Sequence, residues 1–305
     1  MRTLASILGV IALVCAGLVF VSAAPVQAAT PEDPTGFRFL TIGGGARAVG
    51  MAEAMVADSS DAFITEYNPA GLLGVQRFSI SFSHNKFFQD THGEYAALAV
   101  PMGKWALGAR LAYVGTSDIP LRTGPSTDPL GLYDAASGII QGAIARVVDD
   151  RLWVGLSAAY VLEHLESQTA QSGILGIGLR YRAHRNFHVG IAFANVGPKA
   201  KFVDQKIKMP NLLRLGGMWA VTKMSARGEI IVAENDNLRW NFGGEYDIDP
   251  RLAIRAGARI GYDTQVFDAG VGLRTSDGRI GIDYAFAPYS DDLGTTHRFG
   301  ITVRP

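Results

Sequence analysis

Alternation of apolar and polar residues runs through most of this chain, from Phe78 to the C-terminus. The clearest run covers 251–262, where the even positions are Leu, Ile, Ala, Ala, Ile and Tyr and the odd positions are Arg, Ala, Arg, Gly, Arg and Gly. Successive side chains of a β-strand point to opposite faces. Each such run therefore predicts a strand with one apolar face and one face that is charged or small.

Turn residues divide the alternating region into about fourteen strands, each close to the roughly 9–11 residues that a tilted membrane strand needs. An even number of antiparallel strands fits a closed barrel, because closure removes the edge that lipid cannot satisfy. The sequence thus predicts an all-β fold: a transmembrane antiparallel β-barrel of about fourteen strands with a small helical N-terminal plug. The expected strands are 77–84, 94–102, 105–114, 137–148, 152–165, 173–183, 187–196, 212–221, 226–233, 238–246, 252–262, 265–275, 279–286 and 296–304.

The N-terminal region has the features of a secretory signal peptide. Arg2 precedes an almost wholly apolar stretch over 4–20, and Val26-Gln27-Ala28 offers a cleavage site, so residues 1–28 are expected to be removed. A retained anchor is disfavoured because no basic cluster follows. After the signal, no run approaches the roughly 18 apolar residues of a spanning helix. The compartment predicted is the outer membrane of a diderm bacterium, with outer-membrane lipid around the barrel.

Composition narrows the chemistry. Glycine supplies 36 of 305 residues, near twice the usual share of about 7%. The 28 basic and 28 acidic residues balance, so no nucleic-acid partner is expected. The single cysteine, Cys15, falls in the signal, which leaves no thiolate for a disulfide or metal. The histidines are scattered and no Gly-x-Ser-x-Gly element occurs. We therefore expect no catalytic residue, no cofactor and no metal site, and we expect that the protein is not an enzyme.

Arginines are concentrated on the polar parity of the strands, which faces the lumen, since a guanidinium at the lipid midplane costs roughly 2–4 kcal/mol. Acids on that parity are fewer. Two interpretations stay open: a basic wall that favours anions, or cross-strand pairs that fill a narrow barrel. Under the first, Arg255, Arg259 and Arg298 would meet a carboxylate, and Phe39 and Phe63 would contact the apolar part of the same ligand.

Connection lengths predict the orientation of the barrel. Short turns such as Asp249-Pro250 alternate with longer links at 115–136, 166–172 and 197–211. Bacterial barrels keep short turns in the periplasm and long loops outside. The long links are therefore expected at the outer surface.

Residues 29–75 precede the barrel, which takes 76–305, and form the expected plug. Ala48, Met51, Ala52 and Met55 recur at helical spacing and predict a helix over about 46–56. The acids at 58–61 would end it and cap a second turn at about 62–64. Because a residue before proline avoids the helical region, Asn68 should be extended.

The stretches 39–48 and 57–62 and the sequence Asn68-Pro69-Ala70-Gly71-Leu72, ahead of an alternating barrel, resemble the PorV/PorQ family. That family is similar to the FadL group of outer-membrane transporters of hydrophobic compounds. The resemblance implies a fourteen-stranded barrel with an internal hatch, and it places Asn68, Pro69 and Ala70 in the plug motif. The chain departs in being shorter than typical FadL transporters and in ending in Arg304-Pro305 without a terminal aromatic residue.

These observations predict passive transport of hydrophobic or amphipathic small molecules in the FadL manner. The alternative is a PorV-like scaffold or shuttle of a protein secretion system, in which the long loops 115–136 and 197–211 would hold secretion-system proteins.

Overall fold

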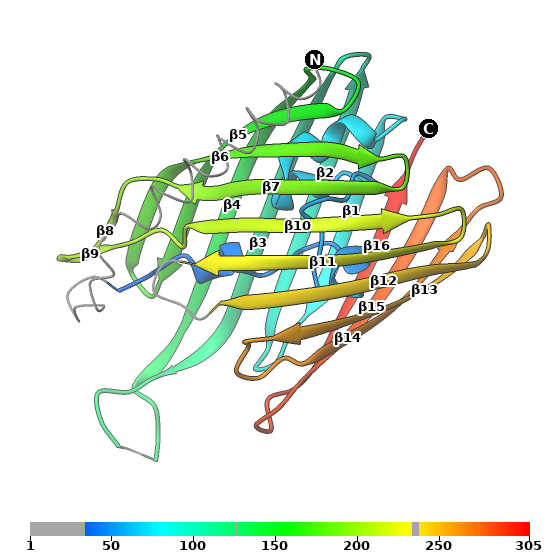
Figure 1. Cartoon of the computed structure of the whole chain (residues 1–305). Coiled ribbons are helices and arrows are strands. Elements are labelled where there is room, and N and C mark those ends of the chain that lie inside the picture. The colour runs from blue at the N-terminus through cyan, green and yellow to red at the C-terminus, as the bar shows by residue number, and fades with distance from the viewer. Residues whose placement is uncertain (1–33, 126, 234–237) are drawn as a thin grey trace. The chain divides into compact units, whose positions relative to one another are not determined.

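The fold is a closed barrel of fourteen antiparallel strands (Figure 1). A computed structural model describes residues 34–125, 127–233 and 238–305. The predicted signal peptide and the first residues of the predicted plug lie outside this part of the chain. Every barrel strand pairs with its neighbours, and β1 (Ser79–Lys86) closes the ring by pairing with β16 (Gly294–Val303). The predicted fold class is confirmed. The other twelve strands of the barrel are β2 (Thr91–Met102), β3 (Trp105–Leu121), β4 (Gly131–Val147), β5 (Leu152–Leu165), β6 (Gln168–His184), β7 (Phe187–Val196), β10 (Leu212–Ala220), β11 (Met224–Ala233), β12 (Arg239–Asp249), β13 (Leu252–Ile260), β14 (Phe267–Arg274) and β15 (Ile280–Tyr289).

The two faces of each strand separate as the alternation predicts. In β1, Ser81 and Ser83 are buried in the lumen, while Phe82 is 51% exposed on the outer wall. Large apolar residues are exposed in the same way on the other strands, among them Leu111 and Ile282. A closed barrel with an apolar outer wall is the fold of an outer-membrane protein, because lipid accepts apolar side chains and no strand edge is left open.

Two of the predicted long links are wrong. β3 and β4 stay paired well beyond 114 and 137, so only 122–130 connects them. The polar and proline-containing sequence suggested a loop, but a bulge between Thr116 and Ile119, with Asp118 at φ 59°, lets the strands continue. The link at 166–172 is also absent, because β6 begins at Gln168 directly after a turn with Glu166 at φ 57°. The third link carries a hairpin of β8 (Ala200–Phe202) and β9 (Gln205–Ile207).

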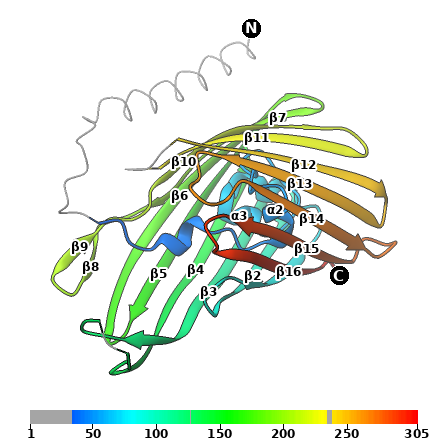
Figure 2. The ribbon, with the colours of Figure 1, turned by 90° about the horizontal axis from the view of Figure 1, so that it is seen from below.

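The segment before β1 is the plug, and it lies within the ring of strands (Figure 2). It contains η1 (Arg38–Thr41), α2 (Ala46–Val49), α3 (Ile64–Tyr67) and η2 (Pro69–Gly74). No helix among the described residues is long and apolar enough to cross a membrane.

The predicted helix over 46–56 is wrong beyond its first turn. α2 ends at Val49, and Ala52 and Glu53 take positive φ values of 51° and 57°, which turn the chain back. The small apolar residues of this stretch are buried on every side and not along one stripe, so their spacing carried no helical signal. The second turn falls at α3, where the Asp61 carboxylate accepts a hydrogen bond from Phe63 N at 2.8 Å. Asn68 is extended, as expected.

Candidate functional site

The plug rests on glycines of the barrel wall, and we call this set the glycine seat. At each one, a Cβ atom would lie closer than 3.0 Å to the plug, in most cases to its backbone. Only glycine allows so close an approach of two backbones. Much of the glycine excess is thus explained by plug contact. The glycine seat comprises Gly108 on β3, Gly155 on β5, Gly178 on β6, Gly190 on β7, Gly243 on β12 and Gly257 on β13.

The Asn-Pro-Ala motif lies against β5 and β6. Asn68 Nδ2 donates to the carbonyl oxygens of Val56 at 2.6 Å and Leu179 at 2.9 Å, and Asn68 Oδ1 accepts from Ala70 N at 3.0 Å. Pro69 opens η2, where a missing N–H has no cost. Asn68 therefore ties two turns of the plug to the wall of the barrel.

A charge cluster joins the plug to β11, β12 and β13. Asp58 of the plug accepts from Arg227 at 2.7 and 2.8 Å, and Arg47 of the plug binds Glu245 through two hydrogen bonds of 2.9 and 3.1 Å. Arg255 contacts the same Glu245 at 2.6 Å. Burial alone would raise the pKa of Asp58, but the guanidinium groups of Arg47 and Arg227 outweigh it and hold that pKa below its ordinary value.

Two further plug carboxylates meet arginines of the wall. Glu53 pairs with Arg259 at 3.1 Å, and Glu66 pairs with Arg110 at 2.7 Å. The backbone of the plug takes part as well, since Val56 N donates to a wall carboxylate, Glu229, at 2.8 Å. The arginine excess of the lumen is therefore largely matched by acids of the plug.

The five residues that the sequence predicts to bind a ligand all lie in the contact region, by which we mean the side chains where the plug meets the barrel wall. Arg255 is also paired with Asp283 at 2.7 Å, and Arg259 with Asp268 at 2.7 Å. These are the cross-strand pairs of the second interpretation. Arg298 donates to Gly43 O at 2.6 Å, and its guanidinium lies 5.1 Å from the ring centroid of Phe87.

Phe39 and Phe63 are buried members of one apolar cluster. Phe63 packs against Gly45. None of the five expected ligand residues lines the cavities described below. Their contact with a ligand stays a prediction.

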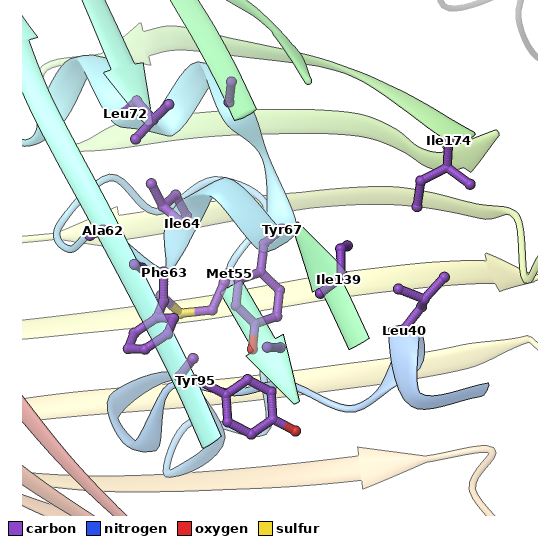
Figure 3. Packing of buried hydrophobic residues seen from close by; sticks show 14 of the residues in the cluster. Leu40, Met55, Ala62, Phe63, Ile64, Tyr67, Leu72, Tyr95, Ile139 and Ile174 are labelled. Carbon is purple, nitrogen blue, oxygen red and sulfur yellow. The ribbon is translucent and has the colours of Figure 1, made fainter. Parts of the chain in front are cut away.

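Apolar side chains of the plug pack in one cluster with apolar side chains of the barrel wall (Figure 3). Leu40 of η1 packs in one cluster with Ile139 of β4 and Ile174 of β6. The chain before η1 is fixed by backbone contacts: Gly36 N donates to Lys208 O at 3.1 Å, and Phe37 N donates to Glu163 Oε2 at 2.7 Å. The chain before η1 is thus fastened to Glu163 of β5 and to the segment that follows β9.

A polar cavity of about 520 Å³ lies at the short-turn end of the barrel, between the plug and β12–β16; we call it the vestibule. A larger hollow of about 610 Å³ lies over the outer faces of β1–β3, β15 and β16 and has a mostly apolar lining. The vestibule is lined by Arg47, Ser59, Ser60, Gly74, Val75, Gln76, Arg77, Glu245, Asp247, Arg274, Asp277, Gly278, Gly281, Asp283 and Arg304.

The fold and the contact region define an outer-membrane β-barrel closed by its own N-terminal plug. Solved structures share this fold. The toluene transporter TbuX of Ralstonia pickettii has a TM-score of 0.65 at 14% identity, over 86% of this chain and 98% of that one. The toluene transporter TodX of Pseudomonas putida has a TM-score of 0.59 at 12% identity, over 90% and 98%. A FadL homologue of Pseudomonas aeruginosa has a TM-score of 0.55 at 10% identity, over 85% and 97%. No family model and no curated protein sequence matches this chain.

The sequence interpretation missed the partners of the lumen arginines. The sequence gives no role to Glu53, Glu66 or Arg47, and it predicts for Asp58 only that it helps to end a helix and cap the next turn. A signal was present, because the plug carries several acids while the lumen parity of the strands carries surplus arginine. Complementary charge on two segments that must touch predicts their pairing.

Proposed function

We propose that this protein carries hydrophobic or amphipathic small molecules passively across the outer membrane. The observation that carries the proposal is a barrel whose lumen is filled by an N-terminal plug, in a fold shared with structures named as toluene transporters and as a FadL homologue. TbuX and TodX are named as toluene transporters. Their names support the same class of activity here.

The filled lumen argues against a general water-filled pore. The plug occupies the glycine seat, and the apolar cluster around Leu40 and Ile174 closes the space along β4–β6. A solute can then pass only if the plug or the N-terminal segment moves. An apolar path favours apolar solutes over ions, because an ion that enters it loses its water and gains no polar partner in exchange.

In this proposal the five predicted ligand residues act after such a movement. When Glu53 leaves Arg259, the Nη2 side of the guanidinium becomes free to meet a ligand carboxylate, while Nε stays on Asp268. Arg298, released from Gly43, would do the same. Arg255 keeps its wall partners Glu245 and Asp283 and would add positive charge beside the ligand, while Phe39 and Phe63 contact the apolar part.

The test is uptake into liposomes that contain the purified protein, with toluene and a labelled long-chain fatty acid as substrates. The full protein is compared with a variant that lacks 37–72. We expect uptake by the full protein and altered flux in the variant, which would place the gate in the plug. Failure of the full protein to take up either substrate would refute the proposal.

The alternative is a PorV-like scaffold or shuttle of a secretion system, supported by the Asn68-Pro69-Ala70 motif and by the many contacts that hold the plug in place. It expects no uptake by the full protein and leak only after removal of 37–72. Co-purification of secretion-system proteins with the full protein would then support it.

A further inference from the structure

The vestibule carries four arginines and four acids, but these groups are not equally engaged. Its acids all have partners: Glu245 and Asp283 pair with Arg255, and Asp247 pairs with Arg274 at 3.0 Å. The remaining acid, Asp277, accepts from Thr275 Oγ1 at 2.6 Å. The carboxylates of this cavity are therefore already satisfied.

Within the described part of the chain, the four arginines of the vestibule fall into two groups: two are paired with a carboxylate and two are not. Arg47 is held by Glu245 and Arg274 by Asp247. Among the residues that the structure describes, neither Arg304 nor Arg77 has a carboxylate within 4.0 Å; Arg77 only reaches the backbone oxygen of Asp277 at 3.4 Å. The vestibule therefore offers two guanidinium groups with unused capacity to bind an anion.

Arg304 is the more significant of the two because it is partly buried beside β15, next to Gly281. Burial lowers the pKa of Arg304, while the more distant carboxylates of Asp61 and Asp283 act in the opposite direction. Both of those acids are engaged elsewhere, Asp61 with Arg47 and Asp283 with Arg255. An anion at Arg304 would supply the close partner that the protein does not.

The size and shape of the vestibule restrict the ligand. Its volume of about 520 Å³ lies in the range of roughly 300–1,000 Å³ found for small-molecule sites. Gly74, Gly278 and Gly281 leave room along its lining, and Val75 is its apolar side chain. A small organic acid with a short apolar part fits these features better than a long chain does.

We propose that the vestibule binds the carboxylate of a small organic acid at Arg304 and Arg77. The extension to transport rests on the proposed function: amphiphiles carried by the barrel would include carboxylic acids that leave through this cavity. The cavity lies between the plug and the wall, and Arg47 and Glu245 of the charge cluster line it, so a ligand there would reach the contacts that hold the plug.

The test is calorimetric titration of the full-length protein in nanodiscs with benzoate, with neutral benzyl alcohol and with inorganic phosphate. The variants are Arg304→Gln, Arg77→Gln and Arg304→Lys. Arg279→Gln is the matched control, because Arg279 is the last residue of the β14–β15 turn, is 65% exposed and does not itself line the vestibule. Folding of each variant is checked by its heat-modifiable mobility in gels.

We expect benzoate to bind the unmodified protein and Arg279→Gln alike, and to bind Arg304→Gln at least about tenfold more weakly, the usual effect of losing a charged hydrogen bond. Arg304→Lys should bind with intermediate affinity. Absence of benzoate binding, or an affinity for benzoate in Arg304→Gln and in Arg77→Gln that equals the affinity of the unmodified protein, would overturn the site. Phosphate binding as tight as benzoate would overturn the amphiphile assignment. Toluene uptake into liposomes is measured separately. A lack of uptake would refute the transport proposal, whereas the binding of benzoate to the vestibule would be unaffected by that result.

Discussion

Replacing Asp58 by Asn should unseat the plug without changing the shape of its side chain. Asp58 is 2% exposed, and its Oδ2 accepts a hydrogen bond from Arg227 Nε at 2.8 Å and lies 2.7 Å from Arg227 Nη2, in a side chain that is 3% exposed. An amide carries no charge, and its NH2 group cannot accept the hydrogen bonds that Asp58 Oδ1 takes from Ser59 N and Ser60 Oγ. Among the described residues, the carboxylate left near Arg227 would be that of Glu245, at 4.0 Å. A buried charge would then lose its close partner.

Removing one member of a buried ion pair costs about 3–5 kcal/mol. If that cost falls on the seated state alone, the equilibrium between seated and unseated plug shifts roughly 100- to 4,000-fold toward the unseated form. We expect Asp58→Asn to raise the open probability in planar bilayers by a factor of this order, while the barrel itself stays folded.

The control is Asp277→Asn, since Asp277 is exposed on the β14–β15 turn and should give the conductance of the unmodified protein. The double variant Asp58→Asn, Arg227→Gln should restore part of the closure, because it removes the unpaired charge as well. Unchanged open probability in Asp58→Asn would refute the assignment of Asp58 as a contact that holds the plug.

Three further predictions use the same bilayer assay. Gly257→Ala places a Cβ on the plug backbone at Ala52 and should cost about 1–3 kcal/mol and increase leak, whereas Gly142→Ala, with open space around it, should be neutral. Asn68→Ala leaves buried backbone groups without partners, at about 1–3 kcal/mol, and should increase leak while the strand signal in circular dichroism is kept. The lowered pKa of Asp58 means that its carboxylate stabilises the seated plug at every pH above the ordinary carboxylate pKa of about 4. The barrel should therefore stay closed down to about that pH and leak increasingly below it. An equally strong response to acid in Asp58→Asn would contradict this role of Asp58.

The barrel could be predicted from the sequence because its signal is local. Alternation along 252–262 is read directly from neighbouring residues, and β13 was found there within two residues. The predicted ends of β3 and β4 were wrong because these two strands stay paired beyond them, through a bulge between Thr116 and Ile119 that has no signature in the sequence. The pairing partner, and not the local composition, decides where such a strand ends.

The plug was harder to predict for the same reason. Ala48–Met55 lacks a polar face, so its periodicity could not report secondary structure, and the reversal at Ala52 and Glu53 depends on Gly243 and Gly257 far along the chain. Asn68 was placed correctly because its constraint is the adjacent proline. Contacts between plug and wall join residues that are as far as 255 positions apart, and single-sequence patterns do not connect such residues.

The plug and barrel depend on one another electrostatically, and this bears on how deletion experiments are interpreted. Without the plug, Arg259 and Arg227 would lose Glu53 and Asp58, and Arg110 would lose Glu66. The emptied lumen would then hold an excess of positive charge, which attracts anions and excludes cations. Leak through the variant lacking 37–72 should thus be anion-selective, whereas leak in Asp58→Asn, where most plug acids remain, should be less so. Reversal potentials in a salt gradient measure the difference, and equal selectivity in the two variants would show that the plug acids do not neutralise the wall.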